Sequence, residues 1–316
     1  MSVTGTKHHT LHSVAVAAPA EVVYGLVADV TKWPQYFGPN VHVEHLEQDA
    51  SGERIRIWAT ANGSVKNWVS RRTFAPDSLR VDFRQEVSAP PVAAMGGAWV
   101  VSPVDGETSL LELHHDFEAV DDDPDGVEWI NAAVDRNSAA ELNNIKELAE
   151  QHADLDELVF SFEDTVHMKA DGAEVFDFLN RADLWPERLP HVARLDLAED
   201  EPGVQVMAMD TSTADGSVHT TESVRVVFAP DRIVYKQTTV PGLMTAHTGR
   251  WTVVPADGGV DVTSRHTVTL KPGAVEKILG EGKTVADARA YVHRALSTNS
   301  TNTLKLARDH AEALHG

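Results

Sequence analysis

Cysteine is absent from this chain of 316 residues. Its absence excludes disulfide bonds, thiolate metal sites and a cysteine nucleophile, and it suits a reducing, cytoplasmic location. Long apolar runs are missing as well, because no stretch approaches ~18 continuous apolar residues and the N-terminus has no apolar signal core. We therefore expect neither a membrane span nor a secretion signal.

Positive charge is scarce, with 27 Lys and Arg against 48 Asp and Glu and a net charge of −21. An acidic surface repels nucleic acid and anionic membranes, so we expect neither as a partner. The sequence also lacks a Gly-rich phosphate loop, a nucleophile elbow and zinc-ligand spacing. The cluster Lys7, His8, His9 and His12 has no counterpart later in the chain, and we interpret it as an exposed N-terminal segment. We expect no metal and no cofactor.

The chain contains a duplication. The matched motifs are Trp33-Pro34 with Trp185-Pro186, Phe74-Ala75-Pro76-Asp77 with Phe228-Ala229-Pro230-Asp231, Trp99 with Trp251, and Asn137-Ser138 with Asn299-Ser300. They keep their order at offsets of about 152 to 162 residues, which is too long for a solenoid repeat and suits a whole domain. The sequence therefore predicts two domains, residues 1–153 and 154–316.

Both halves predict the same element order: a strand, a short helix, a run of six strands and a long C-terminal helix. In the first half we expect helices over Ala20–Ala28 and Val127–His152, with Trp33-Pro34 ending the first helical region. In the second half we expect them over Ala173–Asn180 and Ala286–Leu314. This order predicts an α+β fold, in which an antiparallel sheet curls around the long helix and leaves an apolar cavity.

One strand of each half carries an unusual polar face. Trp68, Ser70 and Arg72 alternate in the first half, so they share one side of the strand. The second half keeps Ser223 and Arg225 but has Thr221 in place of the tryptophan. An inward arginine needs a partner, which indicates a binding site. The alternative is that both strands simply face solvent.

The last strand of each half offers a histidine, His115 and His266. Each shares a face with apolar neighbours, so it is either a core residue or a proton carrier for catalysis.

The long helices carry polar residues that either bind a ligand or lie on an exposed face, namely Asn137, Ser138 and Asn299. Asp135 is a further candidate acid or base, and Ser297 stands at its repeat position. The tryptophans Trp33, Trp99, Trp185 and Trp251 either line the cavity or fill the core beneath it.

In this order, the motifs resemble the di-domain aromatase/cyclases of bacterial type II aromatic polyketide synthases. The resemblance rests on Trp33-Pro34, Trp68-x-Ser70-x-Arg72, Met95-Gly96-Gly97-Ala98-Trp99 and Asn137-Ser138, and on their second-half counterparts. It covers nearly the whole chain. It implies two tandem helix-grip domains of the START/Bet v1 type.

The resemblance also implies an activity: first-ring aldol cyclisation, dehydration to an aromatic ring, or both, on a poly-β-ketone in aromatic polyketide antibiotic biosynthesis. By the same resemblance Arg72, His115, Arg225 and His266 are catalytic. The implied substrate-binding residues are Trp33, Trp68, Ser70, Trp99, Asn137, Ser138, Trp185, Ser223, Trp251 and Asn299. A non-catalytic two-cavity carrier of a lipid or aromatic metabolite is the alternative.

An acyl carrier protein would deliver the substrate, and the ketosynthase or ketoreductase of the same pathway is a further candidate partner. Because such carriers are acidic, a basic rim is expected on this enzyme. The arginines of the first half that could form it are Arg54, Arg56, Arg71, Arg80 and Arg84. They favour the N-terminal domain as the docking and catalytic half.

Overall fold

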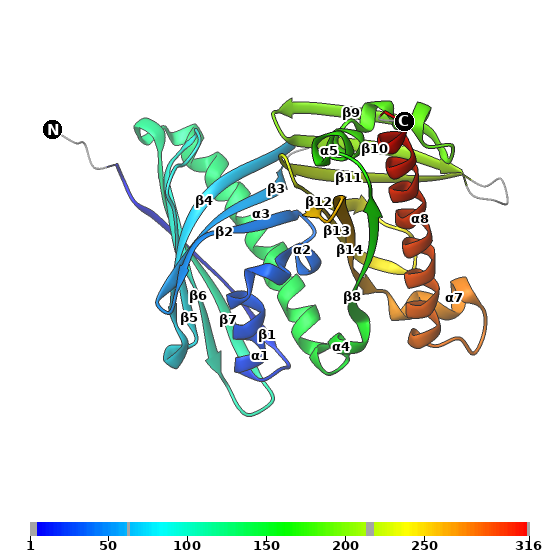
Figure 1. The fold of residues 1–316 in the computed structure, drawn as a ribbon. Coiled ribbons are helices and arrows are strands. Elements are labelled where there is room, and N and C mark those ends of the chain that lie inside the picture. The colour runs from blue at the N-terminus through cyan, green and yellow to red at the C-terminus, as the bar shows by residue number, and fades with distance from the viewer. Residues whose placement is uncertain (1–4, 62–63, 213–217, 315–316) are drawn as a thin grey trace. The chain divides into compact units, whose positions relative to one another are not determined.

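A computed structural model describes residues 5–61, 64–212 and 218–314. The chain divides into two compact units, one ending at Leu155 and the other beginning at Asp156 (Figure 1). Each unit contains one seven-stranded antiparallel sheet with helices. The α+β fold class predicted from the sequence is confirmed.

The N-terminal unit contains β1 (His8–Val16), β2 (Asn40–Asp49), β3 (Gly52–Ala61), β4 (Ser64–Ala75), β5 (Arg80–Gln85), β6 (Val92–Pro103) and β7 (Ser109–Ala119). Its helices are α1 (Ala20–Ala28), α2 (Trp33–Tyr36) and α3 (Pro124–Glu150), and the short α4 (Leu155–Leu158) follows them. The strand order is β1-β7-β6-β5-β4-β3-β2, so β1 closes onto the last strand of the unit.

The C-terminal unit contains β8 (Val159–Met168), β9 (Val192–Glu201), β10 (Val204–Ser212), β11 (Val218–Phe228), β12 (Arg232–Thr239), β13 (Met244–Ala256) and β14 (Gly259–Leu270). Its helices are α5 (Gly172–Asn180), α6 (Trp185–Arg188), α7 (Val275–Leu279) and α8 (Val285–Ala313). The strand order β8-β14-β13-β12-β11-β10-β9 repeats that of the first unit.

Local sequence explains these boundaries. Thr284 forms a capping box with Asp287 at the start of α8, and the Asp171 side chain accepts a hydrogen bond from the backbone N–H of Ala173 in α5. The prediction that Trp33-Pro34 ends a helical region is wrong. The pair begins α2, because a proline in the first helical turn has no backbone hydrogen bond to lose.

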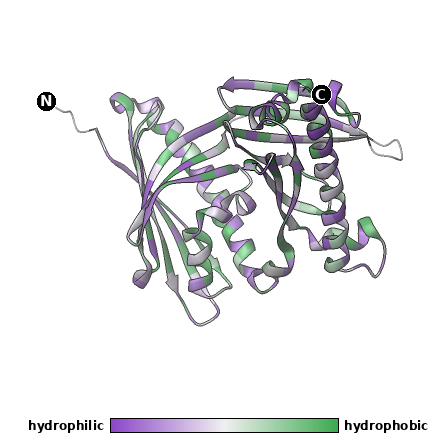
Figure 2. Ribbon diagram, viewed as in Figure 1, coloured by the Kyte–Doolittle hydropathy of each residue, from purple (hydrophilic) through white to green (hydrophobic). Residues whose placement is uncertain are grey.

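The sheet and the long helix share one core in each unit. Apolar and polar residues alternate along the strands (Figure 2). In the N-terminal unit Trp99 and Leu111 of the sheet pack in one buried cluster with Leu142 and Ile145 of α3. In the C-terminal unit Trp251 belongs to a cluster that includes Leu304 of α8. Side chains on the inner face of each sheet therefore point toward the long helix.

Candidate active site

The predicted arginine and histidine of each half lie in a single row of residues that face one another across neighbouring strands. In the N-terminal sheet the row is Glu53, Arg72, Phe83, Gly97, His115 and Thr10, and in the C-terminal sheet it is Gln205, Arg225, Tyr235, Gly249, His266 and Phe162. Residues directly opposite each other share a face, so each row lies on the inner side of its sheet. The two rows occupy equivalent positions in their sheets, but several of their residues differ in chemical type.

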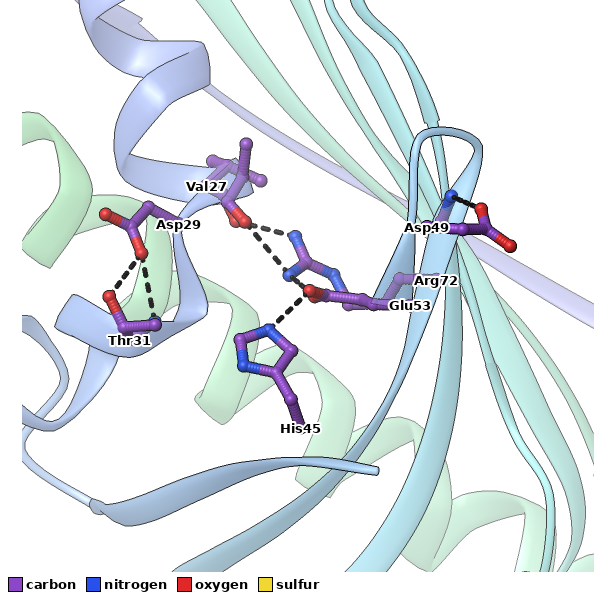
Figure 3. Close-up of polar contacts among 9 residues, drawn as sticks. Val27, Asp29, Thr31, His45, Asp49, Glu53 and Arg72 are labelled. Atoms are coloured by element: carbon purple, nitrogen blue, oxygen red, sulfur yellow. Dashed lines mark hydrogen bonds and ion pairs between the residues drawn. The ribbon is translucent and has the colours of Figure 1, made fainter. Parts of the chain in front are cut away.

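Both Nη atoms of Arg72 are bonded to protein oxygens (Figure 3). Its Nη1 donates to Glu53 Oε1 at 2.6 Å, its Nη2 donates to the carbonyl oxygen of Val27 at 2.7 Å, and both side chains of the ion pair are 2% exposed. The other carboxylate oxygen of Glu53 lies 2.7 Å from His45 Nε2. The guanidinium also stacks on Trp33, with 4.9 Å to the ring centroid. These contacts tie β4 to the end of α1 and serve the fold.

Arg225 has the same location but no carboxylate partner among the described residues. Its Nη2 donates to the carbonyl oxygen of Leu179 at 2.5 Å, while Nε and Nη1 are buried and have no hydrogen-bond partner in the described part of the chain. The side chain is 1% exposed. Burial lowers the pKa of Arg225 to about 10, so the group stays cationic at neutral pH. A buried cation with free N–H donors is prepared to receive an oxygen acceptor.

Two tryptophans hold the guanidinium of Arg225 in place. The ring centroids of Trp185 and Trp251 lie 5.1 and 5.8 Å from its Cζ. Both rings are buried, and Trp185 donates its indole N–H to the carbonyl oxygen of Phe178. Cation–π contacts orient the charge without using its N–H donors.

The difference between the two arginines comes from the facing residue on the neighbouring strand. Glu53 faces Arg72, whereas Gln205 faces Arg225. The amide nitrogen of Gln205 donates to Glu199 Oε2 at 2.9 Å, and its buried carbonyl oxygen Oε1 has no partner within the described ranges. Across the described residues, the neutral amide therefore leaves Arg225 without a directly bonded carboxylate, and Glu199 acts on its charge only from a distance.

Tyr235 extends the C-terminal row toward the histidine. A Cβ at Gly249 would lie 2.1 Å from Cζ of the tyrosine ring, so only glycine lets the ring cross that strand. The phenol oxygen reaches 3.3 Å from His266 Nδ1. Burial raises the pKa of Tyr235 above its usual value, so the hydroxyl keeps its proton. Phe83 stands at this position in the N-terminal row and offers no such group.

His266 belongs to a continuous chain of hydrogen bonds. His266 Nδ1 lies 3.0 Å from His247 Nε2, and His247 Nδ1 lies 2.9 Å from Gln237 Oε1. On its other side His266 Nε2 lies 3.2 Å from Ser264 Oγ, which accepts from the indole N–H of Trp251 at 3.0 Å. When both histidines carry their hydrogen on Nδ1, every donor in this chain has an acceptor: Nδ1–H of each histidine donates, and Nε2 of each accepts. Burial lowers the pKa of His266 to about 4, so the imidazole is neutral at pH 7.

His115 in the N-terminal unit lacks that chain. Its Nδ1 is buried and has no partner among residues that the structure describes, and its ring meets Phe83 edge-on with 5.5 Å between the ring centroids. Burial, together with the nearby His12, lowers the pKa of His115 to about 4. One unit thus has a free arginine and a bonded histidine, and the other has the reverse.

The other predicted residues divide into four groups. Trp33, Trp68, Ser70 and Ser223 lie on the inner faces of the sheets or beside them, while Trp99, Trp185 and Trp251 fill the cores. Ser138 is fully buried, and its Oγ has no partner. The prediction that Asn137 and Asn299 contact a ligand inside the fold is wrong, because both are exposed while the next residue of each helix faces the core. The hydrogen-bonding face of the helix begins one residue later than predicted.

The sequence did not indicate several residues that could bind a ligand or transfer a proton in these sites. Tyr235 and His247 lie on the inner face of strands whose alternation was readable, but only their pairing shows their value. Glu141 on α3, three residues after Ser138, is half-buried, and burial raises the pKa of its carboxyl to about 7. His12, interpreted as part of an exposed segment, is on the inner face of β1.

The expected basic rim is largely neutralised. Four arginines pair with carboxylates, in the pairs Arg54–Glu86, Arg71–Glu86, Arg80–Asp82 and Arg84–Asp116. A hollow of about 330 Å³ lies among these residues, lined chiefly by outward-facing side chains such as His9, Arg71 and His114. It does not include Arg72. Within the described ranges no helix is long and apolar enough to cross a membrane, and no three metal-binding side chains cluster.

Comparison with known families identifies both units. A family described as polyketide cyclase / dehydrase and lipid transport matches residues 7–150 and again residues 159–305. The granaticin polyketide synthase bifunctional cyclase/dehydratase of Streptomyces violaceoruber is 46% identical over 309 residues, covering 97% of this chain and 95% of that protein. The actinorhodin polyketide synthase bifunctional cyclase/dehydratase of Streptomyces coelicolor is 44% identical and covers 98% of both chains.

Solved structures give the same result for the fold. The di-domain aromatase/cyclase BexL from the BE-7585A biosynthetic pathway superposes with a TM-score of 0.89 at 53% identity, covering 96% of this chain and 99% of that one. The di-domain aromatase/cyclase StfQ from the steffimycin pathway gives 0.86 at 38% identity, covering 97% and 99%. The tandem helix-grip arrangement predicted from the sequence is confirmed.

Proposed function

Because this chain belongs to the family of polyketide cyclases, dehydrases and lipid-transport proteins, in its di-domain aromatase/cyclase form, we propose that it is a bifunctional polyketide cyclase/dehydratase. Its substrate is a poly-β-ketone tethered to an acyl carrier protein. The ketosynthase or ketoreductase of the same pathway is a candidate neighbour. The relatives' names support the reaction class, and the geometry supports its location.

The observation that carries the proposal is the buried guanidinium of Arg225, whose Nε and Nη1 have no hydrogen-bond partner among the described residues. A methylene between two ketones is already acidic, so ring closure needs mainly the stabilisation of an enolate and the selection of one carbonyl. The free Nε–H and Nη1–H of Arg225 can donate to such an oxygen in a site from which protein side chains exclude water. The new C–C bond forms from the enolate carbon to a carbonyl carbon, whose oxygen gains negative charge beside this cation.

Trp185 and Trp251 keep the clamp rigid, and Tyr235 can protonate the new alkoxide. The proton that leaves the methylene carbon as the enolate forms replaces the one that the tyrosine gives to the alkoxide, so the step balances, and the phenol oxygen lies 3.3 Å from His266 Nδ1. We assign Arg225 and His266 to this site as predicted. We assign Arg72 a structural role, because its guanidinium donates hydrogen bonds to Glu53 and to two backbone carbonyl oxygens. This reverses the preference for the N-terminal unit as the ring-forming half.

The test is ring formation by Arg225→Lys with a poly-β-ketone generated on an acyl carrier protein by a reconstituted ketosynthase. Lysine keeps the charge but cannot place donors at both free positions, so we expect ring formation to fall by about 10²- to 10³-fold. Arg181→Lys, an exposed arginine of the same unit paired with Asp183, is the control and should keep the parental rate. Parental ring formation by Arg225→Lys would overturn the assignment, and a parent that binds the chain without changing it would support the carrier alternative.

A further inference from the structure

Four buried polar atoms of the N-terminal unit lack hydrogen-bond partners within the described part of the chain, and they come from elements that pack together. They are Thr10 Oγ1, His12 Nδ1, His115 Nδ1 and Ser138 Oγ. Thr10 faces His115 across β1 and β7, His12 is the next inward residue on β1, and α3 packs against both strands. Buried polar atoms nearly always have partners, so four free ones in this region indicate a place for a polar ligand.

Asp135 fixes the state of His12. Its Oδ1 lies 2.9 Å from His12 Nε2, and the two side chains are 64% and 21% exposed. A carboxylate can only accept a hydrogen bond, so Nε2 of the neutral imidazole carries the hydrogen and Nδ1 carries the lone pair. That Nδ1 is the atom buried without a partner. The arrangement is a base whose tautomer and orientation are set by a neighbouring acid.

The C-terminal unit has lost this arrangement. Asp164 takes the place of His12, and Ser297 takes the place of Asp135, with Ser297 Oγ donating to Asp164 Oδ1 at 2.7 Å. Both ring nitrogens of His266 are already engaged by His247 and Ser264. The two copies therefore offer different chemistry: an oxyanion clamp in one and a free imidazole base in the other.

We propose that the N-terminal unit holds a separate proton-transfer site, which dehydrates the cyclised β-hydroxy ketone, with His12 as the base and Asp135 as its positioning residue. The inference rests on the proposed function, because it divides the two steps of that activity between the units. His115, Ser138 and Thr10 bind the oxygens of the ring. The site takes a neutral, oxygen-rich cyclic ketol.

The step balances within the substrate and the imidazole. His12 Nδ1 takes the proton from the carbon between the carbinol carbon and a ketone, and the C–H electron pair forms the new C=C bond. The C–O bond of the carbinol breaks with its electron pair on oxygen. That oxygen takes the proton from the imidazolium and leaves as water, so His12 is regenerated and no redox partner is needed.

The test follows ring formation and dehydration separately in the full-length protein, with the poly-β-ketone supplied on an acyl carrier protein. In His12→Gln we expect dehydration to fall by about 100-fold or more, with a cyclised product one water heavier accumulating and ring formation unchanged. His167→Gln is the matched control, because His167 forms an exposed His–Asp pair with Asp261 in the other unit. It should behave as the parent.

Asp135→Asn tests the positioning role at an exposed site where folding is not at risk. We expect kcat for dehydration to fall about tenfold with KM unchanged, and nitrogen NMR of His12 to change from a single Nε2–H tautomer to a mixture. Parental dehydration by His12→Gln, or loss of ring formation to the same extent, would overturn the inference while the proposed function stands. A parent that forms no ring would overturn the proposed function itself.

Discussion

Replacing Gln205 by glutamate should make the protein more stable and less active at once. In the N-terminal unit a carboxylate in this place forms a buried ion pair with Arg72 at 2.6 Å. The substitution offers the same pair to Arg225, which forms no direct ion pair with any described residue of the parent. The stabilising contact would then consume the N–H donors that the substrate needs.

The expected stabilisation is the balance between a new ion pair and a lost hydrogen bond. Removing one partner of a buried ion pair typically costs about 3–5 kcal/mol, which bounds the gain from adding one. Against it stand the lost amide contact to Glu199, at 2.9 Å in the parent, and a new repulsion with that carboxylate. We expect a net stabilisation of about 1–2 kcal/mol, which raises Tm by about 3–6 °C for a domain of this size. Ring formation should fall by about 100-fold.

The assay is thermal unfolding by circular dichroism alongside product formation, with Gln205→Met as the control of similar volume. Methionine cannot form an ion pair with the guanidinium of Arg225, so the Gln205→Met variant should keep its activity. A Gln205→Glu variant with raised Tm and parental ring formation would refute the role of Arg225. A lowered Tm would refute the argument that Arg225 gains stability from a direct ion pair.

Two further outcomes follow from the same contacts. Glu53→Gln leaves Arg72 buried without its counter-charge, so we expect about 3 kcal/mol of lost stability and a Tm lower by roughly 10 °C, measured calorimetrically; an unchanged Tm would contradict the structural role of the pair. Because burial lowers the pKa of His266 from 6.5 to about 4, the unfolded chain binds this proton at higher pH than the folded one. Stability from this group is therefore complete above pH 6.5 and falls by about 3 kcal/mol as the pH drops toward 4. In urea titrations, His266→Gln should reduce the loss of unfolding free energy at acid pH. An equal pH dependence of that free energy in parent and variant would contradict this prediction.

The fold was readable from the sequence because the duplication showed every signal twice. Alternation placed Arg72 on one face with Trp68 and Ser70, and Arg225 on one face with Ser223, while the paired motifs indicated the two-unit layout. Trp33-Pro34 was misread, since the same dipeptide can end one helix or begin the next, and only the chain geometry decides between them.

The site could be predicted only in part, because partners across strands are set by register. Glu53 and Gln205 lie about 20 residues before the arginines that they face, and nothing local marks them as partners. His12 looked like part of an exposed segment until its pairing with Leu113 fixed its face. Asn137 was misplaced by one position on its helix, which is a rotation of about 100°.

The most direct test makes the same substitution in both copies. Arg225→Lys and Arg72→Lys should be compared for ring formation and for Tm in the full-length protein. We predict that Arg225→Lys loses ring formation with little change in Tm, whereas Arg72→Lys lowers Tm and keeps ring formation in the folded fraction. Loss of ring formation in Arg72→Lys at parental Tm, with Arg225→Lys fully active, would contradict the account.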